Sequence, residues 1–160
     1  MFSVKRGKSV LIVAIVVDDV LMIGNDESLR QEWYTFMRGF FEVSDDGDLK
    51  YYLGVHYTRD GGDLIATQTG YLERVLKRYG MDKCKYAASP MPQKFEVDTD
   101  SLPERGTDKD IEEMRSILGS LQYLQLWSRP EISFSVNYLA RYTLRADKTT
   151  IAAARRVLRY

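Results

Sequence analysis

The sequence predicts an α+β fold, in which a small antiparallel sheet backed by a helix is followed by a helical C-terminal region. Three observations predict this arrangement. Residues 10–17 form an unbroken apolar run that is mostly β-branched, as in a buried strand. Residues 27–40 carry large apolar side chains at helical spacing. An acidic stretch then separates these elements from three further helical patterns.

Composition narrows the class of protein. The 160 residues, of which 44% are hydrophobic and 29% charged, suffice for a globular core. Cys84 and His56 are single, which excludes an intramolecular disulfide partner and argues against zinc or a Ser-His-Asp triad. No apolar segment approaches the roughly 20 residues of a membrane span, so no membrane partner is expected. Because the chain has one histidine and one cysteine, any catalysis must rest on carboxylates. The lone cysteine also indicates a reducing intracellular compartment.

An apolar hairpin with two aspartates at its tip is the first predicted feature. The strand Val10–Val17 is followed, after only Asp18 and Asp19, by a second apolar run, Val20–Ile23. Asp-Asp satisfies the positive φ angles of tight hairpin turns less well than Asn-Gly or Asp-Gly does. Turn geometry therefore does not account for the two aspartates at this position, and another role is expected for them.

A helix and more strands are expected to follow. Asn25 or Asp26 can cap the helix over residues 27–40. Strand-like stretches come at 40–44, 51–58 and 64–67, and a turn-rich loop joins the last two. A second helix is expected over 69–79, with Gly80 as its stop.

The composition changes near residue 89. Ser89-Pro-Met-Pro92 cannot be helical, and residues 95–113 carry eight acidic and two basic residues, which predicts a linker or an exposed meander. Helices are expected over 111–126, 130–143 and from 150 onward, with Thr149 or Thr150 as the last cap. Residues 129–160 carry seven basic and two acidic residues. Both ends of the chain resemble cut ends of a longer protein.

Two adjacent carboxylates in apolar surroundings repel each other and are costly to desolvate. A divalent cation removes that cost, and Mg²⁺ is commonly held by one or two carboxylates plus substrate phosphates. Two such ions can activate a 3′-hydroxyl and stabilise a leaving pyrophosphate in nucleotidyl transfer. Solvated Asp-Asp turns are common, so the pair gains meaning from its context of strand, aspartates, strand and capped helix.

This context resembles the Tyr-Val-Asp-Asp segment of copia-type retrotransposon reverse transcriptases. Further stretches are similar to that family in the same order: 41–55, 68–81, 88–91, 115–124, 128–141 and 152–160. The resemblance implies a partial palm and primer-grip region over 1–92. It also implies an acidic linker over 93–110 and a truncated thumb- and connection-like helical region over 111–160.

The resemblance also implies roles for single residues. Asp18 would bind the catalytic Mg²⁺ ions, with Mn²⁺ as a substitute, and Asp19 would support that metal site. Leu53 and Gly54 would lie at the primer grip. The residues that would face an RNA or DNA template-primer are Arg141, Arg155 and Arg156, for which a solvated helical face is an equally good interpretation.

Two departures from the family pattern matter. Val16 stands where the family has a tyrosine that positions the substrate near the primer terminus. The fingers, an upstream palm strand with another metal-binding aspartate, and the RNase H segment are missing from this sequence, and they would be its partners. We therefore expect the isolated chain to be inactive as a polymerase, and to leave a sheet edge and apolar surface uncovered. The family's location implies cytoplasmic virus-like particles.

Other functions stay open at this point. The chain can be a non-enzymatic nucleic-acid-binding module that uses its basic helices, or a degenerate remnant. Its zero net charge argues modestly against tight, independent nucleic-acid binding. A scaffold protein with an incidental Asp-Asp turn would require all of the ordered matches to be accidental.

Overall fold

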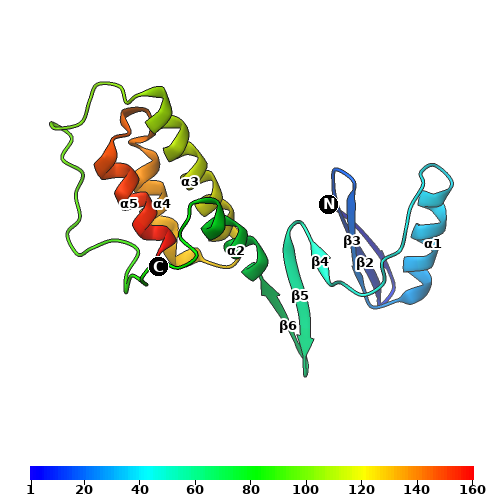
Figure 1. Ribbon diagram of the computed structural model, residues 1–160. Helices are drawn as coiled ribbons and strands as arrows, with labels where there is room; N and C mark the ends of the chain where they lie inside the picture. The colour runs from blue at the N-terminus through cyan, green and yellow to red at the C-terminus, as the bar shows by residue number, and fades with distance from the viewer. The chain divides into compact units, whose positions relative to one another are not determined.

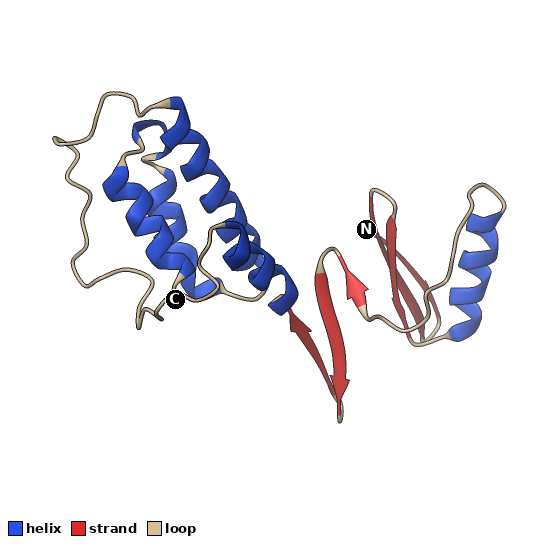
Figure 2. Cartoon of the chain, in the orientation of Figure 1, coloured by secondary structure: helices blue, strands red, loops and turns tan.

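The computed structural model describes residues 1–160, and the chain divides into two units, Met1–Ile65 and Ala66–Tyr160 (Figure 1). The first unit carries most of the strands and one helix, and the second is built from helices (Figure 2). The two sheets have the strand orders β1-β2-β3 and β4-β5-β6. This confirms the mixed α+β class. None of the helices combines the length and apolar character that a bilayer crossing requires.

The first sheet is an antiparallel meander. Its outer strand β1 was not predicted from the sequence, because its residues are all exposed and lack an apolar run. In β2 the side chains alternate, so Leu11 and Val13 are buried on one face, each only 2% exposed. The strands are β1 (Phe2–Arg6), β2 (Ser9–Val16) and β3 (Asp19–Gly24).

Helix α1 (Glu27–Arg38) packs on this buried face, as predicted. Its N-cap is Asp26, whose carboxylate accepts hydrogen bonds from the backbone N–H groups of Ser28 (2.9 Å) and Leu29 (3.4 Å). Leu29 is buried and Trp33 packs beside it against the strands. The helix thereby buries the apolar side chains on one face of the meander.

The opposite face of the meander is uncovered. Val16 and Ile23 lie on it and are 43% and 57% exposed. Strands β1 and β3 each have one edge without a partner strand. The expected exposure of apolar surface and sheet edges is thus present in this unit.

Residues 41–50 do not form a strand, which corrects the prediction of one over 40–44. The apolar residues of that stretch favour a strand, but no neighbouring strand pairs with it, and Phe41 is 63% exposed. The predicted strand over 51–58 is also wrong in detail. It is divided by a turn at Leu53-Gly54, which gives the second sheet: β4 (Tyr51–Tyr52), β5 (Val55–Asp60) and β6 (Asp63–Thr67).

The second unit is a helical bundle around one core. Met114, Ile117, Val136 and Leu139 are completely buried in that core. Val75 of α2 joins them, so this helix belongs to the bundle and the boundary between units falls well before residue 92. The helices are α2 (Thr69–Arg78), α3 (Asp108–Trp127), α4 (Ser133–Ala140) and α5 (Lys148–Leu158), with the short 3₁₀ turns η1 (Pro130–Ile132) and η2 (Thr143–Arg145).

Several predicted helix boundaries change for local reasons. Thr107 caps α3 through a bond from the Asp110 N–H, which starts the helix three residues earlier than expected. The cap of α5 is Asp147, not Thr149 or Thr150, and Thr150 returns a bond as the third residue of a capping box. The expected helix over 130–143 is divided, since its ends adopt 3₁₀ geometry.

The acidic stretch is an irregular segment that is attached to the bundle. Val97 and Leu102 are 8% exposed. The guanidinium of Arg145 donates to the carbonyl oxygens of Pro103 (2.9 Å), Thr99 (2.7 Å) and Leu102 (3.0 Å). Residues 95–106 thus form a packed strap, which is more ordered than a free linker.

Candidate functional site

The hairpin of β2 and β3 closes one residue earlier than the sequence predicted. Val16 pairs with Asp19, so the two-residue turn is Val17-Asp18 and Asp19 is the first residue of β3. Val17 has a φ of +55°, a conformation that β-branched residues rarely adopt. The turn thereby holds Asp18 at the tip of the hairpin, and both aspartate side chains are exposed.

The far end of the hairpin is fixed by an asparagine. The side-chain oxygen of Asn25 accepts from the Val10 N–H (2.8 Å), and its amide donates to the Lys8 carbonyl oxygen (3.0 Å). The next residue, Asp26, caps α1 and also accepts from the Ser9 hydroxyl (2.6 Å). Hydrogen bonds from the Ser28 hydroxyl, the Ser9 hydroxyl and the Ser28 backbone N–H hold the Asp26 pKa at about 2, well below its ordinary value of 3.8. The short connection between the hairpin and α1 is therefore held in place by hydrogen bonds to Asn25 and to the charged Asp26.

An open groove of about 900 Å³ runs beside the hairpin tip within the first unit. Asp18 and Asp19 form part of one wall. Helix α1 contributes Trp33 and Tyr34, and β4 contributes Tyr52, whose hydroxyl oxygen is buried without a hydrogen-bond partner. The groove therefore combines a carboxylate wall, which attracts cations and repels anions, with aromatic surfaces that suit flat rings.

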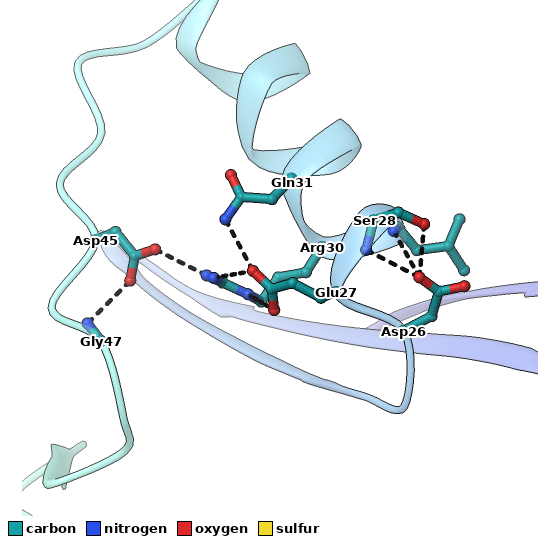
Figure 3. A network of polar contacts seen from close by, with 8 residues as sticks. Asp26, Glu27, Ser28, Arg30, Gln31, Asp45 and Gly47 are labelled. Carbon is teal, nitrogen blue, oxygen red and sulfur yellow. Dashed lines mark hydrogen bonds and ion pairs between the residues drawn. The ribbon is translucent and has the colours of Figure 1, made fainter.

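One further wall of the groove is formed by residues 41–50, which an ion-pair network ties to α1 (Figure 3). The guanidinium of Arg30 binds Asp45 at 2.8 Å and Glu27 at 2.5 Å. The Arg30 guanidinium lowers the pKa of Asp45 and holds that of Glu27 at about 2. Asp45 also accepts from the Gly47 N–H (2.9 Å). Sequence reasoning missed this network, whose only signal was the Glu27/Arg30 spacing along one helix.

The carboxylates at the tip belong to the donor class that Mg²⁺ prefers. Mg²⁺ is usually held by one or two carboxylates together with water and substrate phosphates, so Asp18 and Asp19 fit a substrate-assisted site. No third His, Cys, Asp or Glu side chain joins them to form a metal-binding group. These 160 residues therefore present two ligands but no closed cage.

Other predicted site residues have different positions. Val16 is half exposed and lies beside Asp19, on the uncovered face of the sheet. Leu53 and Gly54 form the turn between β4 and β5, with φ values of +49° and +78°, as in a type I′ turn. They follow the groove-lining Tyr52 but do not line the groove themselves. The structure thus brings Val16 to the aspartates and leaves Leu53 and Gly54 outside the groove.

The three predicted basic residues have unlike surroundings. Arg155 donates to Glu113 (2.7 and 3.0 Å), an ion pair that joins α5 to α3. Arg156 donates to the Ser89 hydroxyl (3.3 Å), and its Nε is buried without a partner. Arg141 is exposed and forms no ion pair; its guanidinium lies over the ring of Tyr138, 4.6 Å from the ring centroid. Of the three, only Arg141 is both exposed and free of an ion pair or a buried nitrogen.

Comparison with known proteins identifies relatives of both units. A family profile described as reverse transcriptase (RNA-dependent DNA polymerase) matches residues 1–93. The whole chain is 34% identical to the Retrovirus-related Pol polyprotein from transposon RE1 of Arabidopsis thaliana, of which it covers 11%. The Pol polyprotein from transposon TNT 1-94 of Nicotiana tabacum is 28% identical over 94% of the chain, which covers 12% of it.

A third relative is much shorter. An uncharacterised mitochondrial protein of Arabidopsis thaliana is 33% identical over 91% of the chain, and the match covers 59% of that protein. The chain thus spans about a tenth of the length of the Pol polyproteins and over half of this one. No solved structure matches the chain.

Proposed function

Because the chain belongs to the reverse transcriptase (RNA-dependent DNA polymerase) family of copia-type retrotransposons, we propose that its first unit supplies the metal-binding turn of a polymerase palm. Asp18 is the direct ligand of a divalent cation, and Asp19 supports it. The single observation behind this assignment is the exposed carboxylate pair at the tip of a hairpin whose other end is fixed by Asn25 and Asp26.

When bound, Mg²⁺, or Mn²⁺ in its place, would polarise phosphate oxygens and lower the pKa of an attacking hydroxyl. The chain's own contribution is to hold the ligands in place. Antiparallel pairing fixes Asp19 opposite Val16, and packing of Leu29 and Trp33 on the sheet stiffens the strands behind the turn. Rigid support of this kind keeps metal ligands at their coordination distance.

The complete reaction that we propose is RNA-directed DNA synthesis on a template-primer, carried out by a longer polymerase. The relatives named as Pol polyproteins are about nine times longer than this chain. Two carboxylates supply fewer oxygen ligands than two metal ions need. We therefore propose that these 160 residues do not extend a primer alone, and that another segment supplies the remaining ligand and the nucleotide-binding surface.

Val16 weakens the proposed site in a defined way. A valine offers no ring against which a primer sugar or base can pack, and it lies beside Asp19. We propose that primer placement in this protein is looser than in relatives that keep a tyrosine here. Leu53 and Gly54 stay a proposed primer grip, since their turn follows the groove-lining strand β4.

A chimeric polymerase tests this function. Residues 1–93 of this chain replace the matching segment of the tobacco polyprotein's polymerase, and extension of an oligo(dT) primer on poly(rA) is measured with Mg²⁺ and with Mn²⁺. We expect activity in the chimera, a loss of at least about a thousandfold in Asp18→Asn, and a gain in Val16→Tyr. Asp46→Asn, which changes a neighbouring groove aspartate, is the control and keeps the activity.

Two results would each reject one part of the proposal. Activity that survives Asp18→Asn would show that this carboxylate binds no catalytic metal. Primer extension by the isolated 160-residue chain, abolished by the same substitution, would keep the metal role but refute the proposed dependence on another segment. A second candidate, a non-enzymatic nucleic-acid-binding module, is favoured only by the exposed cation Arg141 on the second unit.

A further inference from the structure

Helix α4 and the turn after it carry a row of three aromatic rings, of which Tyr138 packs at the edge of the second unit's core and Phe134 does not. Phe134, Tyr138 and Tyr142 recur every four residues, so they lie along one face of the helix and its C-terminal extension. The opposite face is the buried one, where Val136 and Leu139 have no exposed surface. We call the three rings, together with Arg141, the aromatic ladder.

Neighbouring rings of the ladder lie next to one another, and Phe134 and Tyr138 are stacked. The centroids of Phe134 and Tyr138 are 6.0 Å apart with their planes within 22° of parallel, and those of Tyr138 and Tyr142 are 5.5 Å apart. The guanidinium of Arg141 lies 4.6 Å from the Tyr138 centroid and 5.6 Å from that of Tyr142. One row of side chains therefore holds a stacked pair of rings, a third ring whose plane is tilted by 60° from that of Tyr138, and a cation over the last two rings.

The inner part of the ladder has a structural role. Tyr138 accepts a hydrogen bond from the Val97 N–H (3.0 Å), and the ring of Phe95 meets its edge, so this tyrosine holds the acidic strap. The neighbouring Arg145 is likewise occupied by carbonyl oxygens of the strap. Strap attachment thus accounts for Tyr138 and Arg145, but not for the outer members of the ladder.

The outer members, Phe134 and Arg141, have no comparable role. Phe134 is 74% exposed, which is costly for a phenyl ring in water. The Arg141 side chain forms no ion pair with any carboxylate, and it donates one hydrogen bond, from Nε to the Tyr138 carbonyl oxygen at 3.4 Å. A flat apolar ring and an unneutralised planar cation are therefore both offered to solvent on the same helix face.

We propose that the aromatic ladder is a stacking site for single-stranded nucleic acid. An unpaired base presents a flat π face to Phe134, and the adjacent phosphate presents an anion to Arg141, the combination of groups by which single-strand sites bind. The proposal deepens the proposed function, because a polymerase of this family would handle a single-stranded template. It places a contact with that strand on the second unit, apart from the metal-binding turn.

Binding of a labelled oligonucleotide to the 160-residue chain tests the ladder. Fluorescence anisotropy is measured with dT and rU strands of about 15 nucleotides, a length within the usual range of single-strand sites. A strand of equal length and charge that lacks bases separates stacking from phosphate attraction. We expect the chain to bind dT or rU more tightly than the abasic strand, with affinity falling as salt rises.

Substitutions locate the site. Phe134→Ala and Phe134→Leu, the second of which keeps an apolar side chain, should each weaken dT binding roughly 5- to 100-fold and leave the weak abasic binding unchanged. Arg141→Gln should weaken binding of both strands. The matched controls are Leu126→Ala, at an apolar side chain also 74% exposed, and Arg78→Gln, at an exposed arginine of α2; neither should change the affinity. Circular dichroism checks that each variant stays folded.

Equal affinity for dT and abasic strands, or unchanged binding in both Phe134 variants, would overturn the proposal. Concentration-dependent self-association that Phe134→Leu abolishes, without any binding of dT or rU, would assign the ladder to a protein interface instead. Asp18→Asn should leave oligonucleotide binding intact. A failure of the metal site and a failure of the ladder are thereby distinguishable.

Discussion

Val16 lies directly opposite Asp19 across the hairpin, so Val17 and Asp18 alone make the turn. This register puts the β-branched Val17 at a φ of +55° and places Asp18 at the apex. An unfavourable backbone conformation next to the proposed metal ligand is an arrangement that turn stability alone would not select.

Relief of this strain gives the first prediction. A β-branched residue with positive φ costs about 1 to 2 kcal/mol, whereas glycine adopts the conformation freely at an entropic cost of about 0.5 to 1 kcal/mol. Val17→Gly should therefore leave the first unit as stable or up to about 1 kcal/mol more stable. The free energy of unfolding of the first unit is measured by urea unfolding, followed by Trp33 fluorescence. A Trp127→Phe background removes the tryptophan of the second unit. The control Val16→Gly, on a strand, should destabilise; an equal loss in both variants would contradict the strain.

The acid stability of the first unit gives the second prediction. The folded pKa values of Asp26 and Glu27 are both about 2, below their ordinary values of 3.8 and 4.5. The unfolded chain therefore binds protons more readily, so the stabilisation is complete above about pH 4.5 and is lost as the pH falls towards 2. The urea concentration at the midpoint of unfolding, followed by Trp33 fluorescence, should therefore fall with pH in the parent chain. In the double variant Asp26→Asn/Glu27→Gln it should depend less on pH in that window. An unchanged slope would show that other groups are responsible.

The groove wall gives the third prediction. Arg30→Gln removes the Arg30–Asp45 ion pair that ties residues 41–50 to α1, together with the Arg30–Glu27 pair within the helix. Since such partly exposed pairs contribute about 0.2 to 1 kcal/mol, the global stability should change little, whereas amide hydrogen exchange in residues 41–50 should accelerate. Arg6→Gln is the control, because it breaks the exposed Arg6–Glu32 pair between β1 and α1. Faster exchange in both variants would remove the special role of Arg30.

The attachment of the strap gives the fourth prediction. A Cβ at Gly106 would lie 2.3 Å from the Ala146 carbonyl oxygen, so Gly106→Ala must displace backbone. We expect the second unit to lose about 1 to 3 kcal/mol, measured by Trp127 fluorescence in a Trp33→Phe background. Gly119→Ala, in the middle of α3 with open space around it, should instead gain about 0.5 to 1 kcal/mol. Tolerance of Gly106→Ala would mean that the strap is loosely attached.

Local signals predicted much of this fold. The apolar run of β2, the Asp26 cap of α1 and the positive-φ Gly80 after α2 all follow from near neighbours in the sequence. The hairpin that carries the two aspartates was also predicted from local context, the apolar runs on either side of them; their metal-binding role stays a prediction. Where structure depends on sequence neighbours, the pattern was sufficient.

Features that depend on distant partners were not predictable. A one-residue change of register moved the turn to Val17, and only the partner strand decides register. The apolar residues after α1 found no neighbouring strand and stayed irregular. The packing of α2 into the bundle, the Arg30–Asp45 ion pair and the aromatic ladder join residues whose proximity only the folded chain reveals.

Paramagnetic broadening by Mn²⁺ is the most direct test of the metal-binding turn. Amide signals of the ¹⁵N-labelled chain are recorded during a Mn²⁺ titration, and the groove contains its own control in a second adjacent pair, Asp45 and Asp46. Because Arg30 already neutralises Asp45, we predict broadening centred on residues 17–20 that Asp18→Asn abolishes and Asp46→Asn does not. Broadening centred on residues 45–48, or unchanged by Asp18→Asn, would contradict the assignment of Asp18 as the metal ligand.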